Sequence, residues 1–206
     1  MGYLAVADYG AGNLMSVCNA LDFLGVNNRV ASTAEELRRA SGVILPGVGA
    51  FADAMSALEE SGLLSPLRQA ALTKPFLGIC LGMQLLFEES DEMGTTRGLG
   101  LLKGRVERIR TDLKLPQIGW NSLHFLRQTP LTRGIREGDW VYFVHSFQAV
   151  PKEGGDCSAV CDYHTTIPAV VAKGRLFGCQ FHPEKSGETG LRILKNFAGL
   201  CEEESM

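Results

Sequence analysis

The sequence lacks the features that mark several large classes of protein. Its 206 residues carry 20 Lys and Arg against 23 Asp and Glu, so the basic excess typical of nucleic-acid-binding proteins is missing. No run approaches the roughly 20 apolar residues that span a bilayer, and the first residues lack the basic leader of a signal peptide. We therefore expect a cytoplasmic protein that binds neither nucleic acid nor membrane.

The six cysteines have neither the rhythm of a disulfide framework nor the spacing of a zinc site. Cys157 and Cys161 lie close together, but no second Cys or His pair completes a set of metal ligands. In a reducing compartment most of these cysteines are expected to be free thiols that pack as small hydrophobes. The sequence also lacks a Gly-x-x-x-x-Gly-Lys loop or another cofactor motif. We therefore expect neither a metal nor a cofactor.

What the sequence does contain, in its first half, is an alternation of short apolar runs and amphipathic stretches. The apolar runs predict buried strands at residues 4–7, 29–31, 43–45 and 76–79. The amphipathic stretches predict helices at residues 13–24, 34–40, 52–60, 64–72 and from 82 to about 89. The second of these helices has Thr33 as a suitable N-cap. Strands that alternate with helices indicate parallel strands joined by crossover helices.

The second half has a different pattern. Extended segments are predicted at residues 99–109, 117–125, 141–150 and 169–181, followed by a final helix at about 188–200. No repeat or linker-like stretch divides the chain. We therefore predict a single α/β domain over residues 1–206. Its core would be a doubly wound, mostly parallel sheet with an added antiparallel portion and helices on both faces.

A cysteine sits between two glycines at a predicted junction of strand and helix. Gly78, Cys80 and Gly82 form the Gly-x-nucleophile-x-Gly arrangement of a nucleophile elbow, with sulfur in place of oxygen. Such a turn forces the nucleophile into an unfavourable backbone conformation and leaves room only for small neighbours. The N-terminus of the following helix favours a thiolate. Taken alone, the segment fits a buried structural cysteine in a tight turn equally well.

A thiolate mechanism needs a histidine, and one of the four histidines ends an apolar run with a carboxylate two residues further on. This is the segment His182-Pro183-Glu184. In extended backbone, residues i and i+2 face the same side. Glu184 could therefore bind one imidazole nitrogen of His182 while the other nitrogen meets the sulfur of Cys80. Taken alone, His182 could equally just end the strand, but the two motifs together are a much stronger signal for nucleophilic catalysis.

A third segment, residues 46–49, has the sequence Pro-Gly-Val-Gly. Glycines on both sides of Val48 let the backbone rotate and approach a ligand closely, although a plain turn between strand and helix remains open. The three segments 46–49, 78–84 and 180–184, in this order, resemble the triad-type (class I) glutamine amidotransferases. Residues 8–13, 116–121 and 142–147, together with Lys185, resemble one branch of that family, the glutaminase subunits of imidazole glycerol phosphate synthases.

The resemblance implies roles for individual residues. Cys80 would be the nucleophile, His182 the general base and acid, and Glu184 the carboxylate that orients it. The oxyanion would be held by amides of Leu81 and of the Val48–Gly49 peptide. The remaining implied contacts are Gln84, Glu92, Ser146 and Phe147 with glutamine, and Asn13, Trp120 and Lys185 with a partner subunit.

Several of these implied roles have plainer alternatives. Glu92 could be a solvated acid in an acidic run, and Trp120 could be a core residue. Ala11 stands where the family often has proline and Phe147 where it often has tyrosine, so a contact through a phenol hydroxyl is lost while one through the backbone survives.

The resemblance also implies a reaction and a partner. Glutamine would be hydrolysed through a cysteinyl thioester, and a flip of the Val48–Gly49 peptide would suffice to keep the enzyme nearly silent. Free ammonia needs an acceptor site that this chain does not contain. By resemblance the acceptor is a cyclase subunit with a (β/α)8 barrel, bound one-to-one as a heterodimer in histidine biosynthesis.

Three other functions fit parts of the sequence. The glutaminase subunit of pyridoxal-phosphate synthase shares the triad and the size, but residues 8–13 and 116–121 argue against it. A γ-glutamyl cysteine peptidase of similar fold is disfavoured because Gln84 and Glu92 suit a free amino acid better than a peptide. A non-catalytic module on the same fold would have lost a member of the triad, and the triad is intact.

Overall fold

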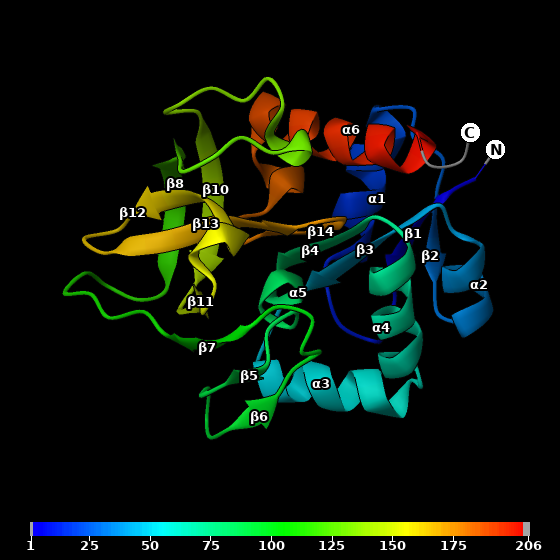
Figure 1. Ribbon diagram of the computed structural model, residues 1–206, viewed down its shortest axis with the longest axis horizontal. Coiled ribbons are helices and arrows are strands. Elements are labelled where there is room, and N and C mark those ends of the chain that lie inside the picture. The colour runs from blue at the N-terminus through cyan, green and yellow to red at the C-terminus, as the bar shows by residue number, and fades with distance from the viewer. Residues whose placement is uncertain (1, 204–206) are drawn as a thin grey trace.

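The computed structural model describes residues 2–203, and its centre is an eight-stranded sheet in the order β2-β1-β3-β4-β14-β13-β12-β9 (Figure 1). Strands β2, β1, β3, β4 and β14 run parallel, and the other three pair antiparallel. The strands are β1 (Leu4–Ala7), β2 (Asn28–Ala31), β3 (Gly42–Gly47), β4 (Phe76–Cys80), β9 (His124–Phe125), β12 (Cys157–Asp162), β13 (Thr166–Lys173) and β14 (Leu176–Cys179). The predicted fold class, a mostly parallel sheet with an antiparallel addition, is confirmed.

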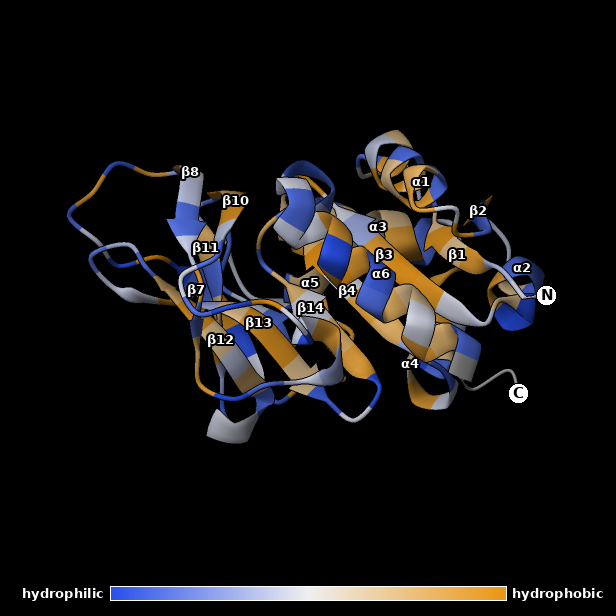
Figure 2. Ribbon diagram, turned by 90° about the horizontal axis from the view of Figure 1, so that it is seen from above, coloured by the Kyte–Doolittle hydropathy of each residue, from blue (hydrophilic) through white to orange (hydrophobic). Residues whose placement is uncertain are grey.

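Helices cover both faces of the parallel sheet because β1, β3, β4 and β14 are buried along their whole length. Along β1, Leu4 and Val6 belong to a buried cluster with residues of α1 and α6. Ala5 and Ala7 belong to the cluster on the other face, with residues of α2, α3 and α4. The two layers of helices lie above and below the sheet in Figure 1, and the strands between them are strongly hydrophobic in Figure 2. The helices are α1 (Leu14–Phe23), α2 (Ala34–Arg39), α3 (Phe51–Glu60), α4 (Leu64–Thr73) and α6 (Gly187–Glu203).

Two smaller sheets stand beside the carboxyl ends of β4 and β14. One pairs β8 (Gln117–Ser122) with β10 (Trp140–His145). The other has the order β11-β7-β5-β6. Its strands are β5 (Glu89–Ser90), β6 (Thr96–Arg97), β7 (Gly104–Arg108) and β11 (Phe147–Pro151). The amide of His182, just beyond β14, donates to the carbonyl of Tyr142 in β10 at 3.0 Å, which ties the two parts together.

The structure differs from the sequence-based expectation at three places. The helix expected to run from residue 82 to about 89 is a single turn, α5 (Leu81–Gln84), because the chain then turns to pair Glu89 and Ser90 with β7. The extended segment 169–181 reverses at Gly174, where φ is +59°, and forms the hairpin of β13 and β14. Of the segment 99–109, only β7 is a strand, and β5, β6 and β12 were not predicted.

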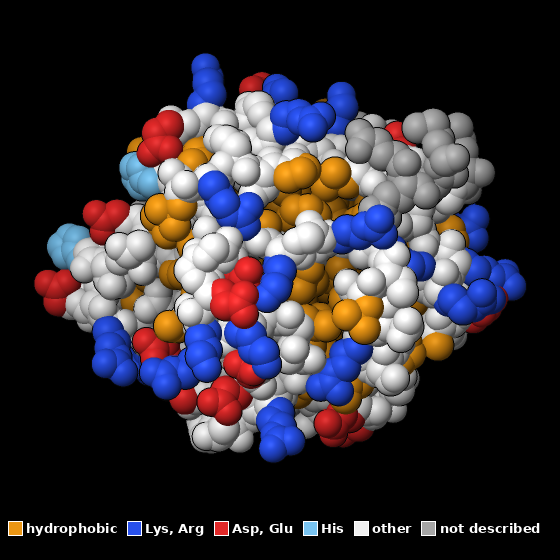
Figure 3. Space-filling model, in the orientation of Figure 1, with side chains coloured by type: hydrophobic (Ala, Val, Ile, Leu, Met, Phe, Trp, Pro, Cys, Tyr) orange, Lys and Arg blue, Asp and Glu red, His pale blue; other side chains and the backbone are white. Residues whose placement is uncertain are grey.

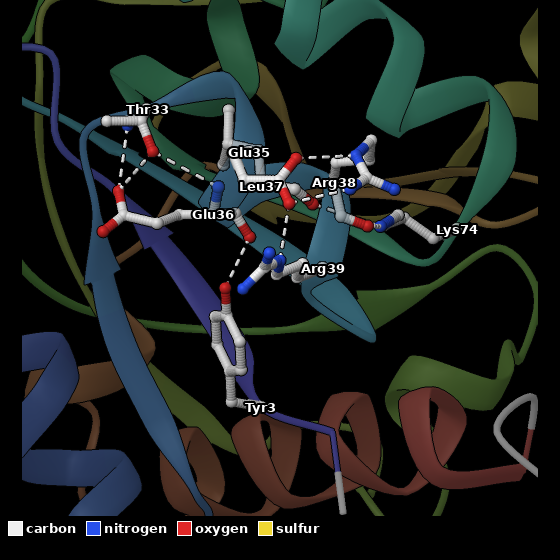
Figure 4. Close-up of polar contacts among 8 residues, drawn as sticks. All are labelled: Tyr3, Thr33, Glu35, Glu36, Leu37, Arg38, Arg39 and Lys74. Carbon is white, nitrogen blue, oxygen red and sulfur yellow. Dashed lines mark hydrogen bonds and ion pairs between the residues drawn. The ribbon is translucent and has the colours of Figure 1, made fainter.

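Helix α2 shows how side chains fix a short element near the edge of the sheet (Figure 4). Thr33 Oγ1 accepts from the amide of Glu36, and the Glu36 carboxylate accepts from the amide of Thr33, which confirms Thr33 as the N-cap. At the other end, Lys74 Nζ donates to the carbonyls of Leu37, Arg38 and Ala40. A helix of this length is unstable alone, and these contacts satisfy backbone groups at both of its ends.

The surface has no field of a single charge on the face shown in Figure 3, where basic and acidic side chains are interspersed. None of the helices within residues 2–203 is both long and apolar enough to cross a membrane.

Candidate active site

Cys80 lies on a sharp turn between β4 and α5. Its backbone has φ 55° and ψ −113°, a conformation that is unfavourable for a residue with a Cβ. A Cβ at Gly78 would lie 2.5 Å from the carbonyl oxygen of Gly82, and a Cβ at Gly82 would lie 1.8 Å from that of Leu45. Both neighbouring positions therefore require glycine. The predicted elbow geometry is present, although the helix that follows it is only one turn long.

His182 and Glu184 form a buried pair directly after β14. His182 Nδ1 lies 2.8 Å from Glu184 Oε1, and the two side chains are 3% and 1% exposed. Because the carboxylate can only accept, Nδ1 carries the proton and Nε2 remains for another partner. The sequence predicted this pairing in extended backbone. In the structure His182 is extended, whereas Glu184 belongs to the 3-10 helix η3 (Pro183–Lys185), and the side chains still meet.

The charges around His182 favour its protonated form. Burial by itself lowers the pKa of His182, but interactions with the Cys80 thiolate and with the Glu184 carboxylate outweigh burial and raise the pKa to about 9. The imidazole is therefore held as an imidazolium at neutral pH. Such a group can give a proton to a leaving group that departs from carbon attached to the Cys80 sulfur.

A second buried side chain, Gln180, reaches Cys80, and no role was predicted for it from the sequence. Gln84 Nε2 donates to the carbonyl of Phe147 at 2.9 Å and to Gln180 Oε1 at 3.0 Å. The side-chain oxygen of Gln180 therefore faces Gln84, and the Nε2 of Gln180 points toward the Cys80 sulfur, 3.9 Å away. This orientation follows from the Phe147 carbonyl, which can only accept. The signal in the sequence was a glutamine two residues before His182 on an apolar strand.

The predicted residues converge on one cavity of about 340 Å³, within the size range of small-ligand sites. The cavity is lined by Val48, Gly49, Cys80, Leu81, Gln84, Glu92, Val144, His145, Ser146, Phe147 and His182. Every residue predicted for the oxyanion or for glutamine is therefore in its wall. A larger depression of about 590 Å³ lies along α6, but its lining contains neither a cysteine nor a histidine.

The predicted oxyanion segment lies between β3 and α3. Gly49 has φ +95°, in the left-handed region that glycine adopts far more readily than other residues. Val48 is 45% exposed, so its side chain does not hold the segment in the core. The conformation of the segment is set by the elements on either side of it.

Glu92 is not a solvated acid. Its Oε2 accepts from the amide of Phe51, the first residue of α3, at 2.8 Å. Its own amide donates to Ser90 Oγ at 3.2 Å, which holds the turn after β5. These contacts hold the carboxylate in the wall of the cavity that Cys80 also lines.

His145 is a further cavity residue without a role predicted from the sequence. Its Nδ1 lies 2.8 Å from the carbonyl of Phe147, so the neutral ring carries its proton on Nδ1. Burial lowers the pKa of His145 to about 4, with the facing His182 adding to the effect and the bond to Phe147 opposing it. Its Nε2 is buried without a partner among residues 2–203. The Phe147 carbonyl thus accepts from both His145 and Gln84, which fixes this wall of the cavity.

The residues predicted for a partner interface lie outside the cavity. Trp120 projects from the outer face of the β8–β10 sheet and is 49% exposed, so it is not a core residue, and it makes an edge contact with Tyr142. Lys185 is exposed on η3, and Asn13 precedes α1. The helix η3 contacts both α1 and β10, and β10 pairs with β8, so the elements that carry or follow these three residues adjoin one another.

Cys18, Cys157, Cys161 and Cys179 are buried free thiols, as expected for most of the cysteines. Burial raises the pKa of Cys157 to about 11 and that of Cys161 to about 12. Burial also raises the pKa of Cys179. These thiols stay protonated and inert at neutral pH.

Known proteins resemble this chain in both sequence and structure. The profile of the family described as glutamine amidotransferase class-I matches residues 5–200 of the chain. Imidazole glycerol phosphate synthase subunit HisH of Bacillus cereus (strain G9842) is 50% identical over 200 residues, 97% of this chain and 95% of that protein. The protein of the same name from Geobacillus thermodenitrificans (strain NG80-2) is 51% identical over 207 residues, with 97% of each chain covered.

Solved structures resemble the fold at lower identity. PurLQS from Thermotoga maritima has a TM-score of 0.77 at 21% identity, covering 97% of this chain and 99% of that chain. A glutamine amidotransferase from the same organism has a TM-score of 0.64 at 17% identity, covering 100% of this chain and 86% of that chain. At such identities the structural likeness shows only the fold. The sequence relatives and the family profile also show the family.

Proposed function

Because this chain belongs to the class-I glutamine amidotransferase family, we propose that it is the glutaminase subunit of an imidazole glycerol phosphate synthase. It hydrolyses glutamine to glutamate and ammonia, and the ammonia is used in histidine biosynthesis. The observation that carries the proposal is the meeting of Cys80, His182 and Glu92 in one cavity, with Glu184 bonded to the histidine. Relatives about half identical over nearly their whole length bear that subunit's name.

The first step is attack of the Cys80 thiolate on the side-chain amide carbon of glutamine. A bond forms between sulfur and carbon, and the carbonyl becomes an oxyanion. When the oxyanion collapses, the bond from carbon to nitrogen breaks, and the imidazolium of His182 gives its proton to the departing nitrogen. The products of this step are ammonia and a glutamyl thioester on Cys80.

The second step is hydrolysis of the thioester. His182, now neutral, takes a proton from a water molecule, which attacks the thioester carbon and releases glutamate and the thiolate. Glu184 stabilises the imidazolium formed in this step and keeps its free nitrogen directed at the cavity. Gln180 donates to the sulfur as it becomes negative again.

The oxyanion is held by the amide of Leu81 and by the Val48–Gly49 peptide. Both segments line the cavity next to Cys80. An oxyanion donor is typically worth about 10² to 10³ in rate, so the orientation of one peptide suffices to switch the enzyme. Glycine at position 49 makes a rotation of this peptide inexpensive, which gives a partner a route to activation.

Glutamine lies with its reactive amide at Cys80 and its α-ammonium at Glu92. An ammonium and a carboxylate form a charge-assisted hydrogen bond. Ser146 and Phe147 form the wall between these ends. Gln84 contributes through its place in the wall, because its amide nitrogen is already bonded to Phe147 and Gln180.

The ammonia acceptor lies on another protein, and the exposed apolar side chains beside the cavity support this. Ile118, Trp120 and Trp140 are 61%, 49% and 57% exposed on β8 and β10. Alternation along β10 puts Val144 on the same face, and Val144 also lines the cavity. Large apolar side chains that gather at the surface mark interaction sites. A cyclase subunit with a (β/α)8 barrel would dock here, with Asn13, Trp120 and Lys185 at the interface.

The test is glutamate release from glutamine by the chain alone, by the chain with the cyclase subunit plus its nucleotide ligand, and by Cys80→Ala in the same complex. We expect near silence alone, strong activity in the complex and none with Cys80→Ala. Strong activity of the chain alone would remove the gating and keep the triad. Activity that survives Cys80→Ala would overturn the mechanism.

A further inference from the structure

Helix α3 begins without a cap of its own. Its N-cap residue is Ala50, whose methyl group cannot accept a hydrogen bond, and no side-chain cap is formed locally. The cap comes from Glu92, 41 residues further along the chain, whose Oε2 accepts from the amide of Phe51 at 2.8 Å. A carboxylate is the most favourable group for this position, because the first-turn amides carry partial positive charge.

The carboxylate that caps α3 also lines the cavity with the nucleophile. It is held there by its neighbours: the amide of Asp91 donates to Val106 in β7 at 3.1 Å, and β5 pairs with β7 just before it. Figure 1 shows β5 and β6 beside one end of α3, and contacts between α3 and β6 agree. Glu92 therefore joins a fixed strand pair to the start of α3 across the edge of the cavity.

Three residues separate the end of β3 from the start of α3, and they include the oxyanion peptide. At the β3 end the segment is anchored by the pairing of Gly47 with Cys80. At the α3 end it is anchored by Phe51, whose side chain is fully buried and whose amide is bound by Glu92. Between these anchors the backbone of Val48 and Gly49 can rotate, so the position of the α3 start restricts which way the peptide points.

We propose that Glu92 couples the presence of glutamine to the geometry of the oxyanion segment, which rests on the proposed function of this cavity. A carboxylate has two oxygens, so Glu92 can accept from Phe51 through Oε2 while Oε1 accepts from the α-ammonium of glutamine. Both donors favour the same side-chain conformation of Glu92. Bound glutamine therefore strengthens the cap on α3, and a fixed cap in turn favours binding of glutamine, as reciprocity requires. Glu92 therefore binds the substrate and also positions the oxyanion segment through the start of α3.

The kinetic test separates the two roles of Glu92 in the complex with the cyclase subunit. Glu92→Gln keeps an oxygen that accepts from Phe51 but loses the charge, so KM for glutamine rises at least about tenfold while kcat stays within about threefold. Glu92→Ala loses both contacts, so KM rises and kcat also falls at least about tenfold. This fall in kcat is part of the factor of about 10² to 10³ in rate that one oxyanion donor contributes.

A compensating substitution makes the test specific. Ala50 has the extended backbone of an N-cap residue, with φ −88° and ψ 147°. The Oγ of Ala50→Ser can therefore accept from the amide of Ala52 or Asp53 and fix the start of α3 locally, although it does not replace the bond between Glu92 and Phe51. In Ala50→Ser/Glu92→Ala we expect kcat to recover to within about threefold of the wild type and KM to stay high. Glu89→Ala, which removes an exposed acid three residues away, is the matched control with wild-type constants. A double variant that keeps the low kcat of Glu92→Ala would overturn the coupling, as would a Glu92→Ala that changes KM alone.

Hydrogen exchange gives a readout without turnover. In Cys80→Ala, glutamine should slow exchange of the Phe51 amide, whereas glutaramate, which is glutamine without its α-ammonium, should not. In Cys80→Ala/Glu92→Gln neither ligand should slow it. Equal protection by both ligands in Cys80→Ala would contradict the proposal. If instead the wild-type complex does not hydrolyse glutamine, the proposed function has failed rather than the coupling.

Discussion

The carboxylate of Glu184 lies 2.8 Å from Nδ1 of His182, although a single proline separates the two residues in the chain. Both side chains are almost completely buried. A carboxylate in this place stabilises a positive imidazole and fixes which nitrogen faces the cavity.

Replacing this carboxylate by an amide should nearly abolish turnover. In Glu184→Gln the amide nitrogen can donate to Nδ1, which favours the wrong tautomer and disfavours the imidazolium. We expect kcat to fall by about 10³ to 10⁴, as when an amide replaces the acid of a serine-protease triad. Glutamate release in the complex measures it, with the exposed Glu188→Gln as control. A kcat of Glu184→Gln within about tenfold of the wild-type kcat would rule out this role of Glu184.

The pH dependence of kcat/KM should show an alkaline limb that belongs to His182. The pKa of His182 is about 9, above its ordinary 6.5, so the imidazolium is present at neutral pH and is lost as the pH rises through about 9. We expect kcat/KM to fall over that range, since it reports groups of the free enzyme. Because Glu184 helps raise this pKa, Glu184→Gln should move the limb to lower pH. A limb at the same pH in both enzymes would assign it to another group.

His145 should weaken the fold in acid. Its pKa is about 4 in the folded protein, below its ordinary 6.5. The stability that it contributes is therefore present above about pH 6.5 and lost as the pH falls toward 4, by up to about 3 kcal/mol. His145→Asn can keep a donor to the Phe147 carbonyl but does not titrate. Its free energy of unfolding, measured by urea titration between these pH values, should fall less steeply than that of the wild type. Parallel curves would contradict the assignment.

Gln180 should make Cys80 more reactive. It donates to the sulfur, and hydrogen bonds to charged groups are worth roughly 1.5 to 3 kcal/mol, less at the 3.9 Å seen here. We expect Gln180→Leu to slow alkylation of Cys80 by iodoacetamide at neutral pH by roughly threefold to tenfold. The chain offers a matched control in Gln117, which is also fully buried and donates to the sulfur of Cys161 at 3.7 Å.

Peptide mapping locates the alkylated cysteine in both variants. Gln117→Leu should leave the rate at Cys80 unchanged, because it removes a buried amide beside a different cysteine. Equal slowing in Gln180→Leu and Gln117→Leu would show a general loss of packing, and unchanged rates in both would remove Gln180 from the site.

Most of the parallel half of the fold could be predicted because β1, β3 and β4 are short apolar runs that are buried along their whole length. For example, the signal for the start of α2 is the capping box of Thr33 and Glu36, which lies within four residues. The antiparallel half could not, because its pairings are non-local. The local sequence of residues 85–89 predicts a helix. In the structure, Glu88 instead forms hydrogen bonds with the backbone of Gly104, a residue that is distant in the sequence.

The residues that we propose as catalytic could be selected from the sequence because their pattern is local: a cysteine between glycines, and a histidine two residues from a glutamate. Gln180 and His145 could not, because their roles depend on which side chain each one meets across the sheet. The same holds for Glu92, whose bond to Phe51 joins segments 41 residues apart.

The central claim is that Cys80 carries the glutamyl group during turnover, and trapping that intermediate tests it most directly. The complex is quenched with acid while it hydrolyses labelled glutamine, and its peptides are analysed by mass spectrometry. We predict a glutamyl thioester on the peptide that contains Cys80 and none in Cys80→Ala. Glutamate formation without any labelled Cys80, or a label on another residue, would contradict the account.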